Sequence, residues 1–183
     1  MSRLRNLLVS TIAVGLIGLA TASGTYAAFL SSSANPGNRF TAGTVYVTDD
    51  DAGAALFTIS GSRPSDPAVD RCITVTYGGT LNAQAKLYGA SSGALAPFVN
   101  LTVTEGTTTS PFSSCAGFTP VTVMYSGTLS AFPATFATGL ADPDATWTPA
   151  ETHAYRFSIT LQNNPAAQGL SASAAFTWEA RNL

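Results

Sequence analysis

The sequence predicts an all-β domain, a two-sheet antiparallel sandwich of about eight strands that follows a cleavable N-terminal segment. Three observations lead to this prediction: apolar and polar residues alternate along most of the chain, turn residues separate the alternating runs, and no strong long helical pattern follows the N-terminal segment. Alternation with a period of two is typical of half-buried strands, because successive side chains of a strand point to opposite faces of the sheet. Many short strands without long helices favour two packed sheets.

The first 28 residues differ from the rest of the chain. Arg3 and Arg5 give a positive start, and residues 7–22 form an apolar run without a charge, ahead of small residues that end at Ala28. A basic start, an apolar core and small residues at a cut site are the three parts of a secretory signal. The run is shorter than the roughly 20 residues of a membrane-spanning helix, and no basic cluster follows it. We therefore predict that residues 1–28 are removed and that one domain is exported.

The first half of the exported part contains four predicted strands. Residues 40–48 and 54–60 give the first two, and a run of three aspartates, Asp49 to Asp51, separates them. Residues 73–77 and 81–87 alternate clearly, and the pair Gly78-Gly79 between them predicts a tight hairpin.

The second half contains four more predicted strands, with turn residues between them. They cover residues 99–104, 121–125, 155–162 and 170–179. Residues 132–140 predict one short helical turn, with Pro133 near its start and Gly139 near its end. The turn is too short to change the fold class.

The composition excludes some partners. Charged residues are only 10% of the chain, below the roughly 25% that is usual for soluble domains. Threonine, serine, alanine and glycine fill the surface positions instead, so copies of the chain repel one another weakly. Two of the eight basic residues leave with the signal, and ten acidic residues remain. This negative balance argues against nucleic acid or an anionic membrane as a partner.

Cys72 and Cys115 are the only cysteines, and both lie in the exported part. An isolated pair in an oxidising compartment predicts one disulfide. It would close a loop of about 44 residues and contribute about 4 kcal/mol to stability. A metal site would need two further ligands, and the chain has a single histidine. We therefore expect the two cysteines to pair with each other.

No catalytic or cofactor site is predicted. The only histidine, His153, lies in a turn before a strand, and no serine, cysteine or acidic partner can be assigned to it by spacing. We therefore expect a surface histidine. The chain lacks HExxH, a Gly-x-Ser-x-Gly elbow and a phosphate-binding glycine loop. We expect Asp49 to Asp51 to form a solvated turn rather than a calcium site, because consecutive residues at a strand end splay apart. A pair of carboxylates that acts on sugars stays an open alternative, although most acidic residues fall in predicted turns.

Both ends of the exported chain resemble one family. Residues 24–29 (GTYAAF) and 40–44 (FTAGT) are similar to the start of the TasA/camelysin family of secreted bacterial fibre proteins. The end of the chain, residues 163–169 and 175–180 (AFTWEA), resembles the closing strand of that family.

An internal unit agrees in part with the same family. Residues 64–66 and 72–80 (CITVTYGGT) resemble its unit of proline, glycine and acid followed by a strand. Ser65 replaces the usual glycine and Tyr77 the usual asparagine, and the cysteine pair departs from the best-known members. The resemblance spans most of the chain, and its N-terminal block is the specific part.

The resemblance implies a jelly-roll subunit that is secreted and assembles with copies of itself into extracellular fibres of a biofilm matrix. It implies cleavage by a dedicated type I signal peptidase at Ala27, Ala28 and Phe29, between Ala28 and Phe29. Matrix or anchor proteins are further partners on this view. In such fibres the new N-terminus can act as a donor strand that fills a gap in the next subunit.

The residues after the cleavage site suit a donor strand. Residues 29–39 are largely polar, and apolar Phe29, Leu30 and Phe40 frame them. An extended segment can add to an open sheet edge through main-chain hydrogen bonds, and a head-to-tail contact that does not close makes a filament. We therefore divide the chain into a signal peptide (1–28), a candidate donor segment (29–39) and a jelly-roll domain (40–183).

Two alternative functions stay open. One is a monomeric cell-surface binding module or adhesin. The other follows from the camelysin name, since some camelysin-like proteins have been called metalloproteases. The sequence offers no zinc motif of histidine and glutamate, so we expect a structural protein and no enzyme.

Overall fold

The structure, a computed structural model, describes residues 41–108 and 110–183. The predicted signal peptide with its cleavage site, and the candidate assembly residues Phe29, Leu30 and Phe40, lie outside the described residues. Among the described residues, no helix is long and apolar enough to cross a membrane.

Strands dominate the described part, and only three single-turn 3-10 helices interrupt them. The strands are β1 (Val47–Asp49), β2 (Val69–Tyr77), β3 (Ala83–Ser92), β4 (Val99–Thr107), β5 (Thr119–Thr128), β6 (Leu140–Ala141), β7 (Thr152–Leu161) and β8 (Ser173–Asn182). The 3-10 helices are η1 (Ala96–Phe98), η2 (Leu129–Ala131) and η3 (Pro165–Ala167).

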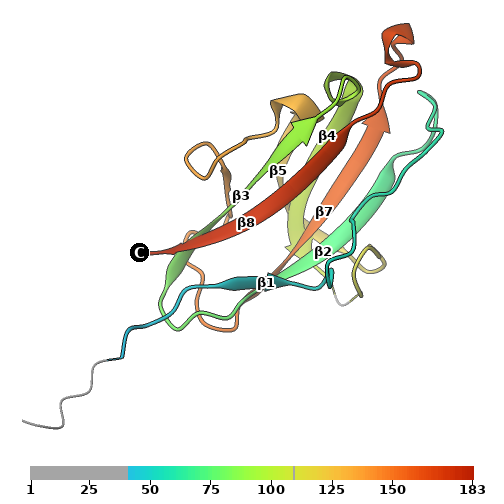
Figure 1. The fold of residues 1–183 in the computed structure, drawn as a ribbon. Coiled ribbons are helices and arrows are strands. Elements are labelled where there is room, and N and C mark those ends of the chain that lie inside the picture. The colour runs from blue at the N-terminus through green and yellow to red at the C-terminus, as the bar shows by residue number, and fades with distance from the viewer. Residues whose placement is uncertain (1–40, 109) are drawn as a thin grey trace, which may run out of the picture. The chain divides into compact units, whose positions relative to one another are not determined.

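The strands form two antiparallel sheets, which confirms the predicted sandwich (Figure 1). The larger sheet has the order β1-β2-β7-β4-β5, and the smaller sheet has the order β6-β3-β8. The sheets therefore differ by two strands, so the smaller one leaves part of the larger one without a strand above it.

The strand pairs follow a nested series. β2 pairs with β7, β3 with β6 and β4 with β5, so each earlier strand meets a later one, as in a hairpin that is rolled up. This is the predicted jelly-roll-like connectivity. The next outer pair of the series would join β1 to β8. Instead, β1 pairs with β2, with Val47 opposite Tyr77, and β8 has β3 as its only strand partner in the described part.

The core lies between the two sheets and is rich in aromatic residues. The larger sheet buries Ile73, Val75, Tyr77, Leu101, Val103, Tyr155 and Phe157, and the smaller one buries Ala83, Ala85 and Leu87. The ring of Phe157 lies 4.5 Å from that of Phe176 and 6.0 Å from that of Trp178, between ring centroids. Both partners belong to β8, so these contacts join the sheets, and aromatic pairs at this range add to the energy of burial.

The predicted hairpin at Gly78-Gly79 is wrong, because β2 and β3 belong to different sheets. The connection instead pairs with the segment before β1: the backbone N–H of Thr80 donates to the carbonyl oxygen of Thr44 at 2.9 Å. A side chain on Gly79 would collide with the hydroxyl of Tyr77. The glycines therefore allow close packing at a crossing between the sheets.

Two other local predictions need correction. The early strand predicted at 40–48 is reduced to β1. The run 132–140 holds a short turn as predicted, in which the backbone N–H groups of Thr138 and Gly139 donate to carbonyl oxygens three positions earlier. No strand was predicted at β6, which is only two residues long.

Phe157→Ala tests the core. The side chain is fully buried against β8, so its loss leaves a cavity, and we expect the free energy of unfolding to fall by about 3–5 kcal/mol. Urea unfolding followed by tryptophan fluorescence measures it. Val121→Ala is the control, because Val121 is 66% exposed on β5. A similar loss in both variants would contradict the assigned core.

Candidate functional site

Among the described residues, one long strand edge of the sandwich has no partner. β8 pairs with β3 on one side, and no backbone hydrogen bond joins its other edge to another described segment. Such an edge presents free N–H and C=O groups to any incoming strand, and soluble proteins usually protect it with charges, proline or a bulge. Residues 173–178 contain neither a charge nor a proline, and the pairing with β3 runs without a register shift. The first charge of β8 is Glu179.

Other long edges are protected. At β2, the backbone N–H of Asp50 donates to the carbonyl oxygen of Thr74, and the N–H of Ser113 donates to that of Cys72. β5 carries Pro120, and its register with β4 shifts twice. Such bulges twist an edge strand away from further pairing. The unprotected edge of β8 is therefore distinctive within the described residues.

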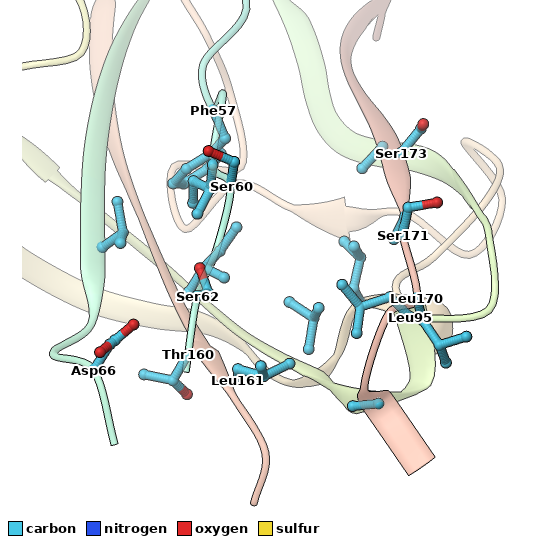
Figure 2. A pocket seen from close by; sticks show the side chains of 18 of the residues that line it. Phe57, Ser60, Ser62, Asp66, Leu95, Thr160, Leu161, Leu170, Ser171 and Ser173 are labelled. Atoms are coloured by element: carbon cyan, nitrogen blue, oxygen red, sulfur yellow. The ribbon is translucent and has the colours of Figure 1, made fainter. Parts of the chain in front are cut away.

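An apolar groove lies beside β8. Its cavity has a volume of about 1140 Å³, and it separates β8 from residues 54–64 (Figure 2). Ile73, Ile159 and Leu161 of the larger sheet and Phe176 of β8 are among the apolar residues that line it. The groove exists because the smaller sheet ends at β8 and does not extend over β2. The core is consequently open on this side of the sandwich.

The second wall of the groove is the segment that we predicted as the strand 54–60. The structure shows no strand there. Residues 55–61 make no hydrogen bond to another described residue through their backbone, although Phe57 and Ser60 lie along the groove in Figure 2. Segment 54–60 has the apolar pattern of a strand, but a strand forms only where a neighbouring strand pairs with the segment. That prediction is therefore wrong.

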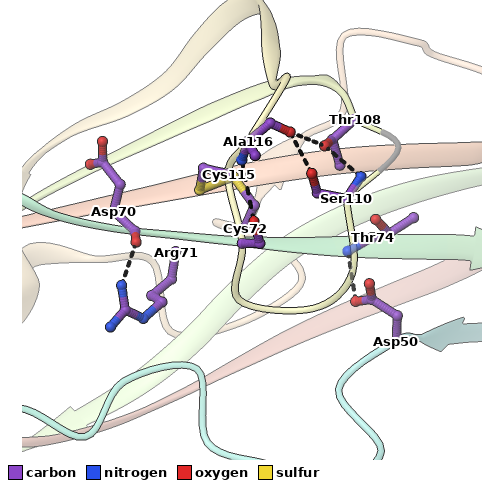
Figure 3. The surroundings of a disulfide bond; sticks show 10 residues. Asp50, Asp70, Arg71, Cys72, Thr74, Thr108, Ser110, Cys115 and Ala116 are labelled. Atoms are coloured by element: carbon purple, nitrogen blue, oxygen red, sulfur yellow. Dashed lines mark hydrogen bonds between the residues drawn. A yellow bond between two sulfur atoms is a disulfide. The ribbon is translucent and has the colours of Figure 1, made fainter.

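The predicted disulfide between Cys72 and Cys115 is confirmed (Figure 3). Their Cα atoms are 5.1 Å apart, which is within the usual range for a disulfide. Cys72 lies in β2, and Cys115 lies in the loop between β4 and β5. The bond holds this loop against the outer edge of β2, where Ser113 donates its hydrogen bond. The disulfide therefore fixes the cover of that edge.

The aspartates after β1 use their carboxylates for local turns. Asp51 accepts a hydrogen bond from the backbone N–H of Gly53 at 2.6 Å, and Asp50 accepts one from that of Thr74 at 2.9 Å. Burial, together with the neighbouring side chain of Asp51, raises the pKa of Asp49 above its ordinary value, and the hydrogen bond from the backbone N–H of Asp51 opposes this only in part. The run ends a strand and begins a turn.

The expectation of a surface histidine is wrong. His153 is the second residue of β7, and its side chain is only 11% exposed. Its ring stacks on the fully buried ring of Trp147, with 4.4 Å between centroids and 6° between planes. Spacing assigned no acidic partner to it, because Glu105 and Asp142 come from distant segments; Glu151, two residues before His153, is a partner that the sequence analysis missed.

Several carboxylates surround His153. Its Nδ1 lies 3.4 Å from Oε1 of Glu105 and 3.6 Å from Oδ1 of Asp142. On the other side of the ring, Nε2 lies 3.1 Å from Oε1 of Glu151. The carboxylate of Asp144 completes a group with Glu151 and His153, in which the nearest ligand atoms all lie within 4.8 Å of one another. We call these five residues the acidic cluster.

The environment shifts the pKa of several groups there. Burial raises the pKa of Glu105 above its ordinary value, and the contact with His153 opposes this only in part. Burial alone would also raise the pKa of Glu151, but hydrogen bonds from the backbone and hydroxyl of Thr148 outweigh it and lower that pKa. Burial and the neighbouring Asp142 raise the pKa of Tyr155, whose hydroxyl donates to Asp142 at 2.6 Å.

No protein-family model matches the chain, and no curated protein matches it at a significant level. The resemblance to the TasA/camelysin family thus rests on the motifs in the sequence. Function has to be argued from the open edge of β8, the groove beside it and the acidic cluster.

The contribution of the disulfide can be measured directly. Because the bond limits the unfolded chain, reduction should lower the free energy of unfolding by about 4 kcal/mol. Urea unfolding of the oxidised protein, with and without dithiothreitol, gives this value. The double variant Cys72→Ala/Cys115→Ala is the control, and its stability should not respond to the reductant. A wild-type protein that is equally insensitive would contradict the expectation.

Proposed function

We propose that the protein is an exported structural subunit that assembles into extracellular fibres by strand addition at the open edge of β8. The observation that carries the proposal is this edge, which is long, uncharged over residues 173–178 and unpaired within the described part. It lies beside an apolar groove and at the position where the nested strand pairs lack their outermost member. A strand from another copy would complete the series.

The donor in this proposal is the segment 29–39, at the N-terminus that cleavage would create. A strand that adds to β8 gains main-chain hydrogen bonds along the edge, and its alternate side chains enter the groove. Apolar Phe29, Leu30 and Phe40 supply side chains of the right kind for an apolar floor. An extended chain advances about 3.3 Å per residue, so the segment is longer than the uncharged part of β8.

Strand addition of this kind gives a filament. The donor segment and the acceptor groove are different surfaces, so the contact is head to tail, and a head-to-tail contact that does not close on itself continues without limit. The low content of charged residues, 10% of the chain, supports the same proposal, because it weakens the repulsion between neighbouring subunits.

Two features support export. The N-terminal segment has the parts of a secretory signal, and disulfides persist mainly in oxidising compartments outside the cytosol. A type I signal peptidase would be the first partner of the chain, and other copies would be the main partner. Matrix or anchor proteins would complete the assembly.

The groove also supports a second candidate, a monomeric cell-surface binding module. Ser60, Ser62, Ser171 and Ser173 lie around its apolar floor in Figure 2. A concave apolar site with a few polar groups is typical of ligand-binding pockets. An extended glycan or peptide would then occupy the place of the donor strand.

The first experiment places a charge in the groove. Ala174 is exposed, lines the groove and shares a face of β8 with Phe176. Ala174→Arg should therefore fold normally but force an incoming strand to bury a charge, which costs more than 1.4 kcal/mol. We expect fibre formation by the exported chain, followed by light scattering and negative-stain microscopy, to fall about tenfold or more.

Asn182→Arg is the matched control, because Asn182 is exposed on the same strand and lies outside both the uncharged edge and the groove. It should assemble almost as the wild type does. A synthetic peptide of residues 29–40 should block growth by occupying the acceptor edge. Unchanged assembly of Ala174→Arg would contradict strand addition at β8. A stable monomer that is unaffected by deletion of residues 29–39 would favour the binding module.

A further inference from the structure

The acidic cluster carries more negative charge than the protein balances. Glu105 and Asp142 are buried, Glu151 is partly buried, and Asp144 lies at the surface. Within the described residues, the only cationic group at ion-pair distance from any of them is His153. One imidazolium offsets at most one of four carboxylates. Buried charges in proteins are normally paired or coordinate a metal ion, so a further cation is the missing component.

Glu105 is an independent sign of this missing component. Its side chain is 8% exposed, and it reaches from β4 toward His153. One of its oxygens, Oε2, is buried without a hydrogen-bond partner among the described residues. A buried carboxylate oxygen without a donor is costly. A cation at Nε2 would polarise the ring of His153 and so stabilise the charge of the Glu105 carboxylate through the contact between Nδ1 and Oε1.

The two nitrogens of His153 have different surroundings. Nδ1 faces the carboxylates of Glu105 and Asp142, which favour a proton on this nitrogen. Nε2 faces Glu151 and Asp144 and lies at hydrogen-bond distance from Oε1 of Glu151; as a metal ligand it would direct its lone pair to the ion in place of this hydrogen bond. A carboxylate behind a histidine is the usual device for orienting a metal-binding imidazole, since it fixes the tautomer and raises the basicity of the ligand nitrogen.

The loop between β6 and β7 presents the two other candidate ligands. Thr148 donates hydrogen bonds to Oε2 of Glu151 from its backbone N–H at 2.6 Å and from its hydroxyl at 3.0 Å, which leaves Oε1 toward the histidine. Oδ1 of Asp144 accepts a hydrogen bond from the N–H of Thr146 at 3.1 Å, so Asp144 is also held by its own turn. The loop therefore holds both carboxylates in place.

We propose that His153, Glu151 and Asp144 bind a divalent transition-metal ion, with Zn²⁺ as the best match, and that Glu105 and Asp142 orient the histidine from behind. Ligand atoms that share one zinc ion at about 2.1 Å lie within about 4.2 Å of one another. The observed group is compact enough to reach this with small side-chain movements. One nitrogen and two carboxylate ligands leave a fourth position for water.

The ligand types separate zinc from the common alkaline-earth ions. Calcium and magnesium take oxygen ligands almost exclusively, whereas an imidazole nitrogen suits zinc and its neighbours in the periodic table. The ion would link the loop that carries Asp144 and Glu151 to His153 of β7. This site departs from the expectation that the protein binds no metal.

Zinc titration of the exported chain tests the site. Protein that has been freed of metal with a chelator is titrated with ZnCl₂ and followed by calorimetry and by tryptophan fluorescence, because Trp147 stacks on His153. We expect one ion per chain and a rise in melting temperature with zinc concentration, since binding to the folded state alone stabilises it. Calcium at the same concentration should produce neither effect.

Variants identify the ligands. Asp144→Asn and Glu151→Gln should each weaken zinc binding about tenfold or more, and Glu105→Gln, which acts through His153, should weaken it by about 10-fold to 100-fold. Asp144 is exposed, so its variant should keep the fold, which circular dichroism checks. Asp70→Asn, at an exposed position of β2, is the control and should bind zinc as the wild type does.

Three results would overturn the proposal. The first is the absence of zinc binding to the wild type, and the second is binding that Asp144→Asn leaves unchanged. The third is an equal response to calcium that survives His153→Gln, because a site without the nitrogen ligand would not be the one proposed. Fibre assembly is a separate readout, since the acidic cluster lies near the start of β7 and the groove near its end.

Discussion

The pairing of β1 with β2 decides which edge of the sandwich stays open. β1 contributes only three residues, yet it pairs with the edge of β2 and leaves β8 with a single partner in the part of the chain that the structure describes. The groove follows from the same pairing, because no described strand extends the smaller sheet past β8 and the apolar floor stays uncovered. The open edge, the groove and the proposed mode of assembly therefore all depend on the pairing of β1 with β2.

Local alternation predicted the strands well and their partners poorly. The inward faces of 73–77, 99–104 and 155–162 were readable, because burial on one side imposes a period of two. The hairpin at Gly78-Gly79 and the strand at 54–60 failed for a common reason. Whether a segment pairs with another strand depends on residues far along the chain. A local pattern of apolar and polar residues carries no information about those residues. The disulfide was predictable because only two cysteines are present.

Part of the acidic cluster could have been predicted from the sequence, and part of it could not. Glu105 continues the inward series that ends at Val103, and His153 precedes Tyr155 by two residues, so extended alternation places both on the inner face. The structure pairs Glu105 with Tyr155 across the two strands. The approach of Asp142 and Glu151, in contrast, depends on how the loop between β6 and β7 folds, for which turn residues give no register.

The disulfide also makes the reduced chain differ from the oxidised chain. In a reducing compartment Cys72 and Cys115 stay as thiols, and the loop that covers the edge of β2 is held by non-covalent contacts alone, such as the hydrogen bond from Ser113 and the packing of Phe112 against the core. Oxidation secures that cover and leaves the edge of β8 as it was. In the oxidised chain the edge of β2 stays covered, so that β8 is the one long open edge among the described residues. If the proposed assembly is correct, oxidation before chains meet would leave a single edge at which a donor strand can add.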